Sequence, residues 1–164
     1  MQRRTRLPAT LSPACRLLLG PERAEIFDRL MDPETGNPRE LMAALRDDPG
    51  FGQAVVECDT VDRLGPMFSD DRGEWTAESE RSGALGDASF GVAWTFATLH
   101  DKPDAFNHLP ATNRPVTVRG FTILGVDVDA DSGDEKVKVR RYVDWAGVFG
   151  QLGLTLNWRV PLPN

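Results

Sequence analysis

Residues 136–143 read Lys-Val-Lys-Val-Arg-Arg-Tyr-Val, a stretch in which apolar and polar side chains alternate. Successive side chains of a β-strand point to opposite faces of the sheet. One face of this strand therefore holds Val137, Val139, Arg141 and Val143, and the other holds Lys136, Lys138, Arg140 and Tyr142. Strands with one apolar face are typical of antiparallel sheets that cover a core on one side only. The stretch predicts such a sheet, with Arg141 on its inner face.

Similar patterns predict the neighbouring elements. Segments 74–85, 88–100 and 116–129 are rich in β-branched and aromatic residues and are bounded by Gly, Pro or acidic turns, which indicates three further strands besides 136–144. The acidic run 131–134 predicts the hairpin turn before the last strand. After that strand, Asp144 is a helix cap for 145–152, and Gly153 occupies the terminating position.

The part of the chain before Pro66 has helical spacing instead. Ser12-Pro13 and Asn37-Pro38 each combine a capping side chain with a proline at the first helical position. Apolar residues recur every three or four positions in 21–31, and again from Phe51 to Gly65. We therefore expect the first 65 residues to be helical throughout. Helices first, strands second and a closing helix predict an α+β fold.

Length and composition narrow the class of protein. With 164 residues, 40% hydrophobic and 27% charged, the chain is expected to form a single domain over 1–164, with a flexible basic leader at 1–11 and a tail at 154–164. A net charge of −6 disfavours nucleic acid and anionic lipid as partners. No apolar run is long enough for a signal peptide or a membrane span, so we expect a cytoplasmic protein whose Cys15 and Cys58 are reduced and buried.

Residues 86–153 contain a series of short motifs in a characteristic order. They are Gly-Asp at 86–87, Pro-Ala-Thr-Asn-Arg-Pro-Val at 110–116, Val-Arg-Gly-Phe at 118–121, Arg-Tyr-Val-Asp-Trp-Ala-Gly at 141–147 and Gln-Leu-Gly at 151–153. This series, which covers somewhat under half of the chain, resembles the SnoaL-like polyketide cyclase family of the nuclear-transport-factor-2-like superfamily. The resemblance implies a curved antiparallel sheet wrapped around the N-terminal helices as a cone, a small-molecule pocket inside it, and a homodimer formed through the sheet.

The same resemblance implies an aldol ring closure that needs neither cofactor nor metal, performed by a pocket acid and a helper histidine. In this sequence, Arg141 occupies the position of the acid and Thr122 that of the histidine. An arginine stays protonated and cannot act as a general base, although it can bind an anionic group. The cyclase mechanism is therefore not carried over intact.

Three residues remain as catalytic candidates, each with a structural alternative. Asp144 is a potential carboxylate acid or base, but a helix cap at that position is the more common role. Arg141 either binds an anionic ligand or is neutralised by a neighbouring carboxylate. His100, followed by Asp101, is a potential proton acceptor, or a solvated loop residue.

Other residues are candidates for binding a substrate. The aromatic side chains of Trp75 and Trp94 could form a pocket wall, or simply part of the core. Phe106 and His108 belong to the loop after the second long strand, and Thr122 lies on the strand after it.

The leading hypothesis is a SnoaL-like enzyme that performs acid/base chemistry, such as aldol cyclisation or isomerisation, on an apolar oxygenated small molecule. A non-catalytic module that binds a small molecule or mediates assembly is the alternative, favoured by arginine at the acid position. A further alternative is an isomerase or epoxide hydrolase on the same scaffold, which requires a buried carboxylate that the sequence patterns do not identify.

Overall fold

In the described part of the chain, a short strand comes first, followed by four helices, a 3₁₀ turn, four longer strands and a final helix. The computed structural model describes residues 3–68, 73–103 and 109–154. Within them the strands are β1 (Arg3–Arg6), β2 (Glu74–Ala84), β3 (Ser89–His100), β4 (Arg114–Val128) and β5 (Glu135–Val143). The helices are α1 (Pro13–Leu19), α2 (Pro21–Met31), α3 (Pro38–Asp47), α4 (Pro49–Leu64) and α5 (Trp145–Leu152), with a 3₁₀ turn, η1 (Gly65–Met67), after α4. The predicted α+β class is confirmed.

All five strands belong to one antiparallel sheet, in the order β1-β5-β4-β3-β2. The four strands predicted from alternation are present, with ends within two residues of those expected. The expectation that the first 65 residues are helical throughout is wrong at β1, where part of the expected flexible leader pairs with β5 and places Arg6 opposite Lys138. Pairing of this edge strand uses backbone hydrogen bonds, so its run of polar side chains carries no strand pattern.

Side-chain caps start the helices close to where the sequence predicts. Ser12 accepts the N–H of Cys15 at 3.2 Å to begin α1, and Asn37 accepts from the third helix at 2.9 Å. Helix α4 begins at Pro49, two residues before the predicted start, because Asp48 caps it. Helix α5 agrees with the prediction at both ends, since Asp144 accepts the N–H of Gly147 and Gly153 has a φ of 81°.

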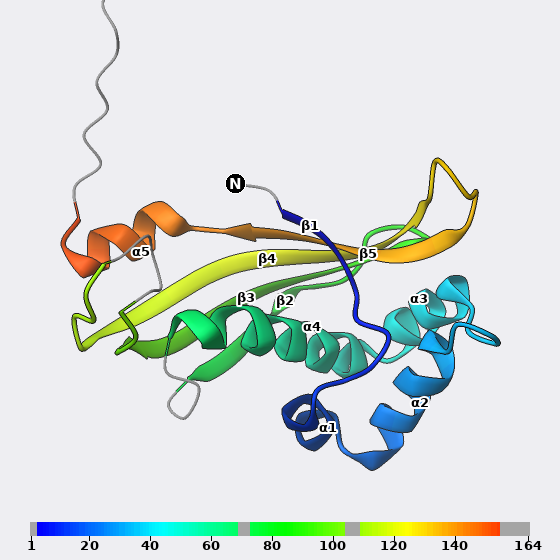
Figure 1. Ribbon diagram of the computed structural model, residues 1–164. Helices are drawn as coiled ribbons and strands as arrows, with labels where there is room; N and C mark the ends of the chain where they lie inside the picture. Colours follow the sequence, from blue (N-terminus) through cyan, green and yellow to red (C-terminus); the bar gives the residue numbers. More distant parts are fainter. Residues whose placement is uncertain (1–2, 69–72, 104–108, 155–164) are drawn as a thin grey trace, which may run out of the picture.

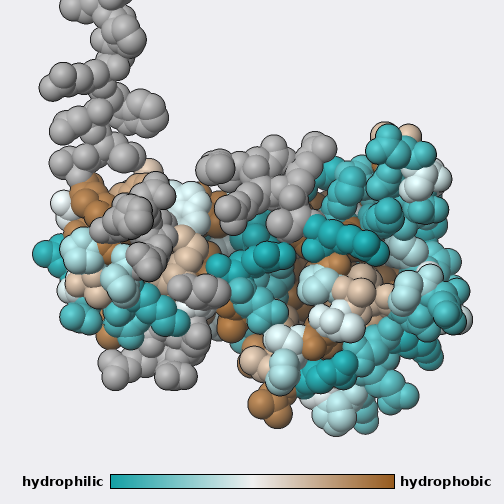
Figure 2. Space-filling model, in the orientation of Figure 1, coloured by the Kyte–Doolittle hydropathy of each residue, from teal (hydrophilic) through white to brown (hydrophobic). Residues whose placement is uncertain are grey.

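The four N-terminal helices cover one face of the sheet. In Figure 1, α4 runs along this face, α1, α2 and α3 gather toward one end, and α5 lies at the other end of the sheet. Helix α5 packs against β4. Figure 2 shows hydrophilic residues over α2 and α3, with hydrophobic atoms at the surface over α1, where Leu17 and Leu18 are exposed.

The space between sheet and helices is largely filled with apolar side chains. Val137 and Val139 are buried on the helix-facing side, while Tyr142 is 43% exposed on the opposite side, as the alternation predicts. Five phenylalanines from both layers are at most 2% exposed and occupy this core; they are Phe27, Phe51, Phe68, Phe90 and Phe96. The middle of the sheet therefore covers a packed core, and the pockets described below lie outside it.

Candidate functional site

A line of buried polar groups crosses the inner face of the sheet and ends on α4. The indole N–H of Trp94 on β3 donates to the Thr122 hydroxyl on β4 at 2.8 Å. Thr122 is paired in register with Arg141 on β5, and the Arg141 guanidinium donates to the carboxylate of Asp59 on α4. The structure thus brings together Trp94, Thr122 and Arg141, which the sequence indicates as site candidates. It also adds Asp59, which the sequence does not indicate.

Strand alternation and helical spacing position these groups. Residues in register on neighbouring strands share a face, so Trp94, Thr122 and Arg141 all point toward the helices. Asp59 lies one turn after Val55 on α4 and therefore projects from its buried side toward the sheet. Trp94 packs closely over Gly120, whose absent Cβ would lie 2.3 Å from the indole ring.

Arg141 and Asp59 neutralise each other in a dry environment. Only 5% of Arg141 and 7% of Asp59 is exposed. A buried ion keeps its charge only with a partner of opposite charge, because removing it from water is costly. Of the two alternatives for Arg141, the structure therefore shows the neighbouring carboxylate.

A cavity of about 180 Å³ lies between α4, α1 and the segment that joins β1 to α1. Asp59 is one of its wall residues, so the polar line on the sheet reaches this cavity through its last member. The lining is Leu7, Pro8, Leu11, Cys15, Phe27, Val55, Cys58, Asp59, Asp62 and Arg63. We call this space the α1–α4 pocket. Most of its wall is apolar, and its charged side chains are those of Asp59, Asp62 and Arg63.

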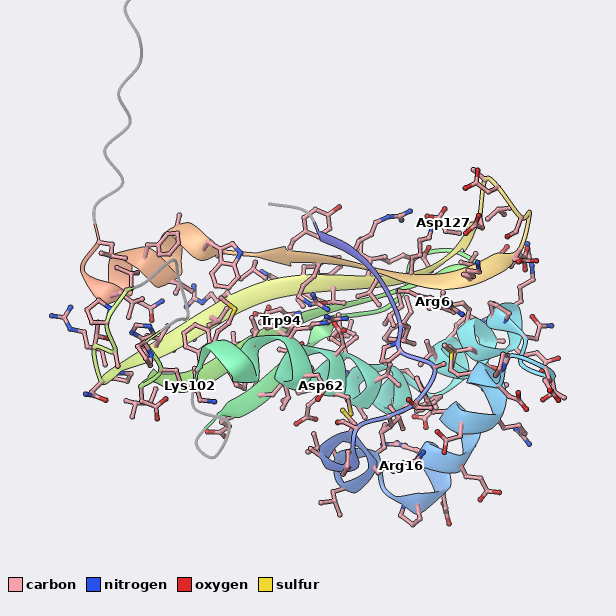
Figure 3. The ribbon with its side chains drawn as sticks, viewed as in Figure 1. Arg6, Arg16, Asp62, Trp94, Lys102 and Asp127 are labelled. Carbon is pink, nitrogen blue, oxygen red and sulfur yellow. The ribbon has the colours of Figure 1, made fainter. Side chains whose placement is uncertain are left out.

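The side of the α1–α4 pocket next to α1 carries a small hydrogen-bonded cluster. Asp62 accepts from the Ser12 hydroxyl at 3.1 Å and from Cys15 Sγ at 3.5 Å. Figure 3 shows Asp62 on α4 and Trp94 on the sheet, in different parts of the site. Cys58 Sγ lies 3.6 Å from the Cys15 carbonyl oxygen, and both thiols are free and buried, as predicted.

The two thiols differ in how easily they ionise. A hydrogen bond from Cys58 lowers the pKa of Cys15 below that of an ordinary thiol, although burial opposes this. The same hydrogen bond, together with burial, raises the pKa of Cys58 well above its usual range. Of the pair, Cys15 is the thiol that loses its proton first.

His100 lies apart from Arg141, at the end of β3. Its Nδ1 accepts the backbone N–H of Thr112 at 3.3 Å and is 3.0 Å from the Thr112 hydroxyl. The ring is fully buried and meets Phe68 edge-on, with 6.1 Å between ring centroids. His100 is therefore a buried residue that joins β3 to the loop before β4, and not the solvated loop residue of the alternative reading. It is not part of the α1–α4 pocket lining.

Asp144 lies on the other side of the sheet from the α1–α4 pocket. It is exposed, caps α5, and lines an open hollow of about 580 Å³ on the outer face together with Arg119 and Tyr142. The structure therefore does not bring Asp144 and Arg141 into one site. The capping role is the one that its contacts show.

Of the remaining substrate-binding candidates, Trp75 lies in the described part of the chain and the two loop residues do not. Trp75 is half-buried and in register with Phe96, so it lies on the inner face, but it does not line the α1–α4 pocket. Phe106 and His108 lie outside the described residues.

Asp59 and the Cys15–Cys58 pair are the site residues that sequence reasoning missed. The signal for Asp59 was its position four residues after Val55, on the apolar side of a predicted helix. No local pattern relates Cys15 to Cys58, because their helices meet only through tertiary packing.

Comparison with known proteins adds no identification. No family model and no curated protein sequence matches this chain. In the part of the chain that the structure describes, no group of three or more His, Cys, Asp or Glu residues is arranged to hold a metal ion. No helix among the described residues is long and apolar enough to cross a membrane.

Proposed function

We propose that this protein is a small-molecule-binding domain of the SnoaL-like type, and that the α1–α4 pocket is its binding site. The observation that carries this proposal is the pocket itself, an apolar space with the carboxylates of Asp59 and Asp62 in its wall. Binding sites for small molecules usually combine such walls with a few polar groups that orient the ligand.

The volume of the pocket limits the size of the ligand. Cavities of roughly 150 Å³ accommodate benzene, whereas sites for drug-sized ligands occupy about 300–1,000 Å³. The 180 Å³ of the α1–α4 pocket therefore suits a molecule of one small ring and disfavours a polyketide. Because Asp62 can accept a hydrogen bond and Arg63 can donate one, the ligand should carry a group that does both, such as a hydroxyl, on an apolar body.

Binding is favoured over acid/base catalysis because of the pairing between Arg141 and Asp59. Arg141 is the residue that the resemblance aligns with the cyclase acid, and its charge is compensated by a protein carboxylate. The pair therefore presents neither a free anion-binding guanidinium nor an uncompensated carboxylate to a ligand.

A thermal-shift measurement with small probes tests this proposal. Phenol and cyclohexanol are expected to raise the Tm, whereas benzene and cyclohexane, which lack a donor, should do so less. At a free concentration of 100 Kd a ligand stabilises the folded state by about 2.7 kcal/mol, or roughly 5–10 °C for a chain of this size.

Two variants locate the binding site. Leu11→Trp fills the pocket and should abolish the shift, while Leu17→Trp adds the same side chain at a position that is 86% exposed and should preserve it. An unchanged shift in Leu11→Trp, or no shift with any probe in the wild type, would contradict the proposal.

A second candidate function is supported by Asp59. An isomerase or epoxide hydrolase on this scaffold needs a buried carboxylate. Asp59 is a buried carboxylate in the pocket wall, and its ion pair with Arg141 must open for it to accept a proton from a substrate. Turnover of small epoxides and ketones by the wild type, reduced at least about 10²-fold in Asp59→Asn, would favour this activity. Asp59→Asn keeps the shape of the side chain but leaves the Arg141 charge without its partner, so its turnover is compared with the wild type at a temperature where circular dichroism shows both to be folded.

We also propose that two copies associate through the outer face of the sheet. Tyr142 is 43% exposed there and, in register with Phe121, lines the open hollow on that face. Tyr142→Glu is expected to shift the protein from dimer to monomer in sedimentation measurements, whereas Leu17→Glu, on α1, should not.

A further inference from the structure

Two cysteines from distant parts of the chain meet at the wall of the α1–α4 pocket. Cys15 on α1 and Cys58 on α4 are 43 positions apart, yet Cys58 Sγ is 3.6 Å from the Cys15 carbonyl oxygen. The Cys58 thiol donates to that carbonyl, so its sulfur lies against the backbone of Cys15. Both line the pocket, so a small molecule inside it can reach sulfur, although the residues are shielded from bulk solvent.

The surroundings give the two thiols different roles. Cys15 Sγ also donates to Asp62 Oδ2 at 3.5 Å; this bond orients the Cys15 thiol, although the negative charge of Asp62 itself raises the pKa of Cys15. The hydrogen bond from Cys58 lowers the pKa of Cys15 and raises that of Cys58. Since the thiolate is the nucleophilic form, Cys15 is suited to attack first and Cys58 to react second.

We propose that Cys15 and Cys58 are a redox modification site, at which a hydroperoxide converts the dithiol into a reversible intramolecular disulfide. In the first step, the Cys15 thiolate attacks one peroxide oxygen and the O–O bond breaks. This gives a sulfenic acid on Cys15 and releases water or an alcohol. In the second step, Cys58 sulfur attacks the Cys15 sulfur, and the departing hydroxide takes the Cys58 proton as water.

Overall, two thiols are oxidised to one disulfide while the O–O bond of the peroxide is reduced. The oxidant must be small, because the pocket that leads to the sulfurs has a volume of about 180 Å³. The product links α1 covalently to α4 and changes the wall of the pocket. This proposal rests on the position of the thiols and does not require that the pocket bind another ligand.

Hydrogen peroxide added to the folded, full-length chain tests the proposal. In the wild type, intact mass should fall by two hydrogen atoms, peptide mapping should join Cys15 to Cys58 within one chain, and dithiothreitol should reverse the change. In Cys58→Ser the sulfenic acid cannot be resolved, so dimedone should label Cys15. That labelling should be at least about tenfold faster than labelling of Cys58 in Cys15→Ser.

Peptide mapping of the wild type decides the proposal even if a serine variant fails to fold. Two cysteines that stay reduced in the folded chain, while the urea-unfolded chain is oxidised, would overturn it, and so would disulfides found only between chains. Equal labelling of the two serine variants would overturn the assignment of Cys15 as the attacking thiol. Loss of ligand-induced thermal shifts has no bearing on these readouts, so the outcome is separate from that of the proposed binding function.

Discussion

Removing one partner of the Arg141–Asp59 pair is expected to destabilise the protein strongly. In Asp59→Leu, the guanidinium of Arg141 remains between the sheet and α4 without its partner, in a residue that is only 5% exposed. Breaking a buried ion pair in this way costs about 3–5 kcal/mol, because an uncompensated charge is left out of water. Arg141→Met leaves the carboxylate unpaired and should cost a similar amount.

These losses are large relative to the total stability of a domain. Folded proteins are typically stable by about 5–15 kcal/mol, so either single variant should lower the urea midpoint greatly. For a chain of this length, the Tm should fall by roughly 6–20 °C. The double variant Asp59→Leu/Arg141→Met removes both charges and is expected to regain most of this loss, because an apolar pair avoids the desolvation cost.

Urea unfolding of the wild type, both single variants and the double variant completes a double-mutant cycle. A coupling energy of several kcal/mol is expected between the two positions. Asp28→Ala is the matched control, because it removes an exposed carboxylate that pairs with Arg16 at 2.7 Å, and should cost at most about 1 kcal/mol. If Asp59→Leu costs no more than this control, or if the two single losses simply add, the reasoning about the buried pair is refuted.

Three further variants test the surroundings of the polar line and the cap of α5. Gly120→Ala should cost about 1–3 kcal/mol in urea unfolding, because its Cβ would lie 2.3 Å from the Trp94 ring, whereas Gly125→Ala meets nothing closer than 3.4 Å and should cost less. Thr122→Val should cost about 1–3 kcal/mol by leaving the indole N–H unpaired, and an unchanged midpoint would show that this hydrogen bond is dispensable. Asp144→Ala should cost about 1 kcal/mol and speed hydrogen exchange in α5, yet leave the probe-induced thermal shift intact; loss of that shift would restore Asp144 to the site.

Much of the fold could be predicted because its signals are local. Alternation from Lys136 to Val143 places every side chain of β5 on the correct face, and Asp144 and Gly153 bound α5 as expected. β1 could not be predicted, since its place in the sheet depends on backbone bonds to β5, which leave no trace in the pattern of its side chains.

The candidate site could be predicted only in part, for a related reason. Strand alternation is enough to bury Arg141 and to place Thr122 on the same face. The partner of Arg141 comes from α4, 82 positions earlier in the chain, and nothing near either residue specifies that contact.

The local sequence determines the α+β class, the two faces of each long strand and the burial of Arg141. These features follow from hydrophobic periodicity and helix caps, which act over a few neighbouring residues. The contacts between residues far apart in the sequence are determined by the packing of distant elements. It pairs Arg141 with Asp59, brings Cys15 to Cys58, separates Asp144 from both, and forms the α1–α4 pocket between α1, α4 and the segment after β1. Such outcomes depend on how two buried surfaces fill space against each other, which short-range patterns do not encode.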